Sequence, residues 1–115
     1  MTINKIDNIT FKLNKQQDFG WLKKYGKAFW GLDETGSGCI CVGMEKAGEK
    51  YFCKIAGVGT LEAEVSPKES VELLKKAVQI YKDLKHPNLI KLVEAYEQEE
   101  LYIAVFQWAE GECLF

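Results

Sequence analysis

The cysteines are the residues in this chain whose chemistry depends most clearly on spacing. The chain has four of them, Cys39, Cys41, Cys53 and Cys113, and one histidine, His86. Metal sites and redox motifs usually pair cysteines with two residues between them, and no such pair occurs here. Cys39 and Cys41 are separated by one residue in a strand-like segment, so both side chains point to one face. We therefore predict small buried thiols in a reducing compartment, with no metal site.

The basic residues bear on any site for anions. All fifteen are lysines, and with seventeen acidic residues they leave a net charge of -2. A chain without arginine has no planar guanidinium for bidentate phosphate recognition. An anion site would therefore use ammonium groups, backbone N–H groups or a metal ion. Because the charge is close to neutral, we expect no nucleic-acid partner.

The length and the hydropathy limit the architecture. A chain of 115 residues, 47% of them hydrophobic, can build one domain with one core. Residues 1–14 are polar and broken, unlike a signal peptide, and no apolar run is long enough to cross a membrane. We expect a cytoplasmic protein without membrane contact.

The pattern of apolar residues predicts five strands and one long helix. Alternation and turn residues place the strands at 27–32, 39–44, 50–56, 91–96 and 101–108, the last two as a hairpin around 97–100. Ser66, Pro67 and Glu69 form a capping box with proline at the first helical position. Apolar residues then recur at spacings of three and four until Pro87 ends the helix. This order predicts an α+β fold, a five-stranded antiparallel sheet with one long helix between strands three and four covering one face.

The N-terminal part is predicted to be an extension of this domain. We divide the chain into an extension with a short helix, residues 1–26, and a domain, residues 27–115. Ile9 to Leu13 is a short mixed run. Asp18 is a candidate cap for a helix over residues 19–25, and Gly26 is its candidate stop.

Three segments, in this order, resemble the amino-terminal lobe of serine/threonine protein kinases. They are the strand Tyr51-Phe52-Cys53-Lys54, the turn from His86 to Leu92, and the stretch from Leu101 to Phe115. The resemblance implies a nucleotide-binding lobe with ATP and magnesium as cofactor. The ATP-site residues that it implies are Lys54 for the phosphates, Gly31 and Gly36 in the glycine-rich loop, Phe106 as gatekeeper, and Gln107 to Ala109 as the hinge that bonds adenine.

Several positions depart from the kinase pattern. Ala77, nine residues before His86, stands where kinases carry the glutamate that pairs with the strand lysine. Phe52 replaces the small residue above adenine, and alternation places its ring on the same face as Lys54. Asp33 replaces the second loop glycine, where a carboxylate would repel phosphate. We therefore predict weak or absent ATP binding, and Lys54 is either a phosphate contact or a strand lysine with its ammonium in water.

Three functions stay open on this evidence. The first is the amino-terminal lobe of a degenerate, pseudokinase-like protein whose large lobe follows Phe115; because the catalytic loop would lie there, this chain alone is predicted to transfer no phosphate. The second is a free-standing interaction or regulatory module, and the third an unrelated small-ligand domain. An apolar surface is expected around Tyr81, Phe106, Trp108 and Phe115. It predicts a partner, either the missing large lobe or a second copy of the chain.

Overall fold

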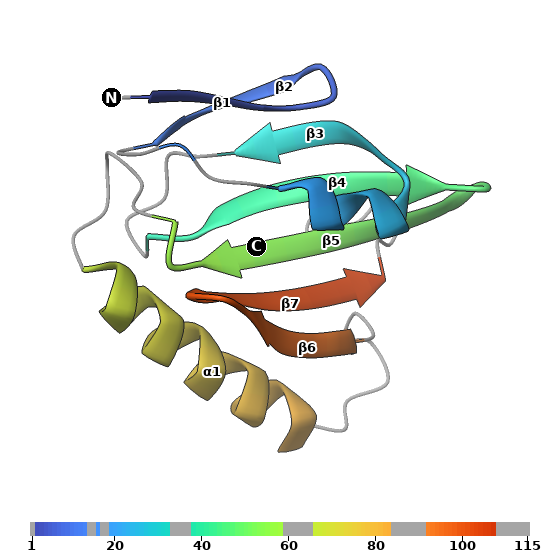
Figure 1. Ribbon diagram of the computed structural model, residues 1–115. Coiled ribbons are helices and arrows are strands. Elements are labelled where there is room, and N and C mark those ends of the chain that lie inside the picture. The colour runs from blue at the N-terminus through green and yellow to red at the C-terminus, as the bar shows by residue number, and fades with distance from the viewer. Residues whose placement is uncertain are drawn as a thin grey trace.

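The computed structural model describes residues 2–13, 16, 19–32, 38–58, 66–83 and 92–107. In these segments a five-stranded antiparallel sheet lies between one long helix and a layer made by the N-terminal residues (Figure 1). Its strands, in spatial order, are β3 (Lys27–Leu32), β4 (Ile40–Lys46), β5 (Glu49–Ala56), β7 (Leu101–Gln107) and β6 (Leu92–Gln98). The predicted α+β fold with one antiparallel sheet and one long helix is confirmed, and β5 is the central strand.

The helix α1 (Pro67–Asp83) begins at the predicted cap. The Ser66 hydroxyl oxygen accepts a hydrogen bond from the Glu69 backbone N–H at 3.2 Å, and the hydroxyl lies 3.4 Å from the Glu69 carboxylate, to which it donates. The first of these bonds satisfies a backbone N–H group that a helix start otherwise leaves unpaired, and the second joins the two side chains. The predicted end of the helix at Pro87 lies outside the described residues.

Ser70 joins the start of α1 to the end of β5. Its side chain is fully buried, accepts a hydrogen bond from the Gly57 backbone N–H at 3.0 Å and donates one to the Pro67 carbonyl at 2.8 Å. Gly57 has a φ of 95°, and an added Cβ would lie 2.7 Å from the Glu100 carbonyl oxygen. The close approach at Gly57 and the hydrogen bond to Ser70 therefore fix the start of α1 against the end of β5.

The sheet buries a different set of side chains on each face. On the face that α1 covers, Leu74 and Val78 pack against sheet residues Cys41, Phe52, Ala56, Ala104 and Phe106. The opposite face contributes Ile40, Val42, Met44, Ile55, Ile103 and Val105 to a second core. Strand alternation produces this division, since neighbouring residues point to opposite faces.

The N-terminal residues form the layer over the second face. Two strands, β1 (Thr2–Ile6) and β2 (Ile9–Leu13), make a hairpin in which Ile6 pairs with Ile9, and a 3-10 helix, η1 (Gly20–Tyr25), follows. The sequence pattern does not predict this hairpin, since residues 9–13 form only a short mixed run. Phe11 and Leu13 are fully buried in the second core, together with Leu22 of η1. The described part of residues 1–26 therefore shares a core with the sheet.

The predicted short helix is present over residues 20–25, but as a 3-10 helix. Gly26 ends it as predicted, with a φ of 97° and its N–H bonded to the Lys23 carbonyl at 3.0 Å. Phe19 occupies the N-terminal cap and provides no side-chain hydrogen bond, while the candidate cap Asp18 lies outside the described residues. None of the helices in the described segments is long and apolar enough to cross a membrane.

Candidate functional site

The predicted ATP-site residues that the structure describes lie on β3, β5 and β7. Phe52 of β5 pairs with Phe106 of β7, and Lys54 pairs with Ala104. Phe52 and Phe106 belong to the core beneath α1, and alternation places Lys54 on that same face between Phe52 and Ala56. Sheet register thus brings two of the predicted residues, Lys54 and Phe106, to the same face as Phe52, which departs from the kinase pattern.

A row of four aromatic rings crosses this face of the sheet. The ring centroids of Trp30 and Phe52 are 6.1 Å apart, those of Phe52 and Phe106 are 6.3 Å apart, and those of Phe106 and Tyr81 are 5.3 Å apart. Phe52 is only 3% exposed and Phe106 8%. These distances are those of packed aromatic pairs. A planar ligand at this level of the sheet would have to displace rings that already contact one another.

Lys54 is half-buried beside Cys41 of β4, its cross-strand partner. Burial raises the pKa of the Cys41 thiol to about 11, while the nearby Lys54 charge acts in the opposite direction. A thiol with a raised pKa is a poor nucleophile at neutral pH. Cys39, Cys41 and Cys53 are free and buried, as predicted. Cys113 lies outside the described residues, and no group of three metal-ligating side chains occurs in the described part.

Ala77 lies on the exposed side of α1, away from the buried stripe of Leu74 and Val78. Its methyl group offers no charge to a lysine on the sheet. Glu72, which lies nearest to it among the acidic residues of the helix in sequence, is exposed and lies 3.9 Å from Lys75. The helix position that the kinase pattern assigns to a glutamate therefore supplies no carboxylate.

Tyr81 carries a hydroxyl that sequence reasoning did not single out. The hydroxyl is buried and has no hydrogen-bond partner among the described residues. Burial raises the pKa of this tyrosine. Only the ring of Tyr81, at an apolar position of the helix, was visible in the sequence pattern.

Gly31 has a packing reason to be glycine. An added Cβ would lie 2.4 Å from the Ile9 Cγ2 atom and 2.7 Å from Phe11 Cζ, so the absence of a side chain lets β2 cross close above β3. This contact lies on the N-terminal side of the sheet. The other predicted positions Gly36 and Ala109, with Asp33 and the turn around His86, lie outside the described residues, whereas Gln107 ends β7 and is exposed.

A polar cluster on the opposite face was missed by sequence reasoning. The Tyr25 hydroxyl donates a hydrogen bond to Glu94 at 2.7 Å and lies 3.0 Å from the Tyr96 hydroxyl. The Lys24 ammonium lies 3.3 Å from the same carboxylate oxygen. The hydrogen bond from Tyr25 is the main cause that holds the pKa of Glu94 below its usual value. The cluster attaches η1 to β6, and no local pattern announces it because its members are about seventy residues apart.

Comparison with known proteins shows partial similarity to protein kinases. The chain is 33% identical over 86 residues, or 74% of its length, to calcium-dependent protein kinases 8 and 7 of Arabidopsis thaliana. Over 46 residues, 40% of the chain, it is 41% identical to calcium-dependent protein kinase 5 of Plasmodium falciparum (isolate 3D7). The matched part spans only 15% of the length of each Arabidopsis protein and 8% of the Plasmodium one. No family model matches the chain.

Proposed function

We propose that this chain is the amino-terminal lobe of a cytoplasmic serine/threonine kinase-like protein with a degraded nucleotide site. The premise is the similarity to protein kinases over 74% of the chain. In this proposal the lobe binds Mg-ATP weakly or not at all and transfers no phosphate by itself. Two observations support it, namely the lysine on the central strand beneath a single covering helix, and the side chains that occupy the space beside that lysine.

The contact between Phe52 and Phe106 is the observation that carries the proposal. Both rings are buried on the helix face, and Lys54 follows Phe52 on the same face of β5. An adenine ring in this position would have to share the space with the Phe52 ring, and overpacking a core in this way costs roughly 1–3 kcal/mol of strain. Such a cost lowers affinity by about one to two decades.

The position of Ala77 supports the same proposal. A lysine orients best on phosphates when a carboxylate fixes its ammonium group, and Ala77 cannot act as that carboxylate. The absence of arginine leaves the lysines as the only permanently charged cations that could hold phosphate.

The test is thermal unfolding of the whole chain with and without millimolar Mg-ATP. We expect no measurable rise in the midpoint for the wild type, because a ligand stabilises the folded state appreciably only when its concentration exceeds its dissociation constant. A rise of several degrees that disappears in Lys54→Ala would contradict the degraded site and restore a functional one. A rise that persists in Lys54→Ala would place the nucleotide elsewhere on the chain.

A second candidate function, a self-associating interaction module, is favoured by the outer face of α1. Leu73 and Ile80 are 48% and 60% exposed. Together with the exposed Ala77 they form an apolar stripe on the side of α1 that does not contact the sheet. Of the residues expected to form an apolar surface, Phe106 is buried, whereas Trp108 and Phe115 lie outside the described residues. Exposed apolar surface of this kind favours association.

We expect the isolated chain to be a dimer at tens of micromolar by light scattering. The double variant Leu73→Glu/Ile80→Glu should be a monomer, because it places two charges on the apolar stripe. Lys68→Glu, an exposed change near the start of the same helix, should leave the mass unchanged. A wild-type monomer at this concentration would remove the support for the module.

A further inference from the structure

The edge strand β3 carries an exposed apolar patch on the face of the sheet where α1 lies. Phe29, Trp30 and Leu32 are 41%, 37% and 41% exposed, and we call these three residues the β3 patch. Trp30 and Leu32 pair with Gly43 and Cys41 of β4, and Cys41 belongs to the core beneath α1. The Phe29 ring lies on this face too, because a Cβ added at Gly43 would lie 3.0 Å from its Cζ atom.

The helix α1 covers another part of this face. It packs on β5, β7 and β6, and Figure 1 shows it near the edge of the sheet opposite to β3. Exposed apolar surface of this kind marks a site of contact with other apolar groups. The β3 patch is therefore a candidate docking surface.

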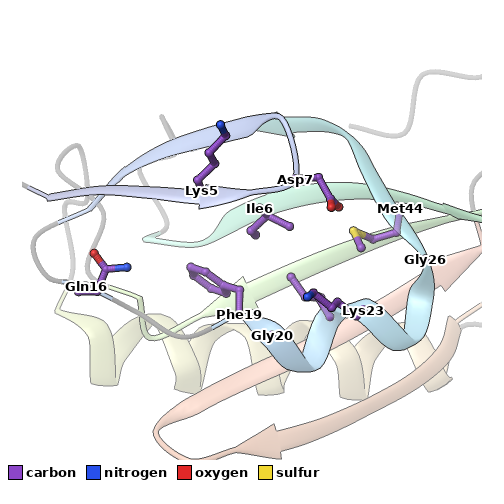
Figure 2. A pocket seen from close by; sticks show the side chains of 10 residues that line it. Lys5, Ile6, Asp7, Gln16, Phe19, Gly20, Lys23, Gly26 and Met44 are labelled. Atoms are coloured by element: carbon purple, nitrogen blue, oxygen red, sulfur yellow. The ribbon is translucent and has the colours of Figure 1, made fainter.

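The other face of the sheet offers less accessible apolar surface. Figure 2 shows a hollow there, between the end of β1, η1 and β4. Its apolar lining residues Ile6, Phe19, Leu22 and Met44 are at most 7% exposed, and charged side chains also line it. Because hydrophobic stabilisation is proportional to the apolar area removed from water, an apolar segment gains more on the β3 patch.

The chain leaves the sheet in the same row as the start of the β3 patch. Gln107, the last residue of β7, pairs with Tyr51, Tyr51 pairs with Met44, and Met44 pairs with Ala28 of β3. Three steps between strands separate β7 from β3, which is about 14 Å. Residues 108–115, which lie outside the described residues, can span roughly 26 Å when extended. They are long enough to reach the whole patch.

The sequence of residues 108–115 combines apolar and acidic groups. Leu114 and Phe115 are large and apolar, whereas Glu110 and Glu112 are acidic. Apolar side chains gain free energy by leaving water for another apolar surface. The segment can therefore supply apolar groups to the β3 patch and carboxylates to its border.

The border of the β3 patch carries a net positive charge. The Lys50 ammonium lies 5.4 Å from the ring centroid of Phe29, and Lys27 is the first residue of β3. Glu45 pairs across the strands with both lysines, so two lysines and one glutamate leave one positive charge. An acidic segment is attracted to this border, whereas a basic one is repelled.

We propose that residues 108–115 dock on the β3 patch of their own chain. The apolar residues at 114 and 115 cover the patch, and the acidic residues at 110 and 112 face its basic border. A short tether gives the segment an effective concentration in the millimolar range, which a second copy at micromolar concentration does not reach. The inference needs no nucleotide site, so its failure leaves the prediction for Mg-ATP unchanged.

The first test compares NMR spectra of the wild-type chain and of Leu114→Ser/Phe115→Ser. We expect the variant to shift the Trp30 indole N–H signal and the amide signals of residues 29–32, equally at tens and at hundreds of micromolar. Lys68→Ser, an exposed change on α1, should leave these signals in place. Unchanged β3 signals in the double variant overturn the proposal. Shifts that occur only at the higher concentration also overturn it, because they assign the patch to a second copy.

A cross-link tests where the segment lies. Cys113 belongs to the segment, and the three cysteines of the described residues are buried. In Leu32→Cys, oxidised glutathione should join the new thiol to Cys113 within one chain roughly tenfold faster than in Glu49→Cys, because docking raises the effective concentration. Glu49 is exposed and begins β5 beside the end of β7, but alternation directs it to the opposite face. Equal or faster cross-linking in Glu49→Cys, or disulfides only between chains, contradicts the proposal.

Discussion

Gly26→Ala is expected to lower the free energy of unfolding by roughly 2 to 6 kcal/mol, which is a large fraction of a small domain's stability. Two costs add. A residue with a side chain at a φ of 97° is strained by about 1–3 kcal/mol. The added Cβ would also lie 1.9 Å from the Glu45 carbonyl oxygen, and relieving such overlap costs about 1–3 kcal/mol more. The neighbour is backbone in β4, so it cannot rotate away.

Gly48→Ala is the matched control for this variant. Gly48 also has a positive φ, 83°, but an added Cβ there meets no atom within 4 Å. The free energy of unfolding of Gly48→Ala should therefore fall only by the backbone cost, at most about 1–3 kcal/mol. Urea unfolding followed by circular dichroism gives both values from the midpoints at constant slope. Equal losses in the two variants would show that the approach of Gly26 to β4 contributes nothing.

Phe52→Ala is expected to cost about 3–5 kcal/mol, the usual loss for a buried phenylalanine. Phe52 is almost fully buried and contacts the rings of Trp30 and Phe106, so its removal leaves a cavity between two aromatic side chains. Phe29→Ala is the control on the neighbouring edge of the sheet, because Phe29 is 41% exposed. Phe29→Ala should lower the free energy of unfolding by clearly less than Phe52→Ala does. A comparable loss in Phe29→Ala would mean that Phe52 is not a core residue.

The same variant tests the role of Phe52 in nucleotide binding. If its ring occupies the place of adenine, Mg-ATP should raise the unfolding midpoint of Phe52→Ala relative to the ligand-free variant and leave the wild type unchanged. The rise should disappear in Phe52→Ala/Lys54→Ala. Absence of any rise in Phe52→Ala, measured where the variant is still folded, would remove Phe52 as the cause of weak binding.

Local patterns were enough to predict the sheet and the long helix. The strand predicted at 27–32 has the same bounds in β3, and the helix starts at Pro67 after the predicted capping box. Other strand ends differ by at most two residues, as at β4, which runs to Lys46. Caps, alternation and turn residues act between neighbours in sequence, so they can be read without knowing the tertiary structure.

The candidate site was predictable only in part. Alternation places Phe52 on the same face of β5 as Lys54, and Phe52 is buried in the core beneath α1. The continuous aromatic row, with Trp30 and Tyr81 at its ends, was not predicted. The four rings come from the strands β3, β5 and β7 and from the helix α1, and no rule of sequence spacing relates these positions.

The N-terminal hairpin was missed for a related reason. Asp7 lies in the tight turn of this hairpin with a φ of 53°. Aspartate and asparagine occur in many kinds of turn, so these residues alone do not identify a hairpin. The hairpin is stabilised by burial of Phe11 and Leu13 against the sheet, a gain that exists only after the chain returns to that face.

The sequence by itself determined the order of strands and helix, the start of α1, the stop at Gly26 and the departures at Phe52 and Ala77 from the kinase pattern. Only the tertiary structure decided that the N-terminal residues cover the second face of the sheet, that Tyr81 of α1 joins a row of sheet rings, and that Tyr25 of η1 reaches Glu94 of β6. The physical reason is distance along the chain. Local propensities and caps act over a few residues, whereas these contacts depend on which surfaces the folded core brings together.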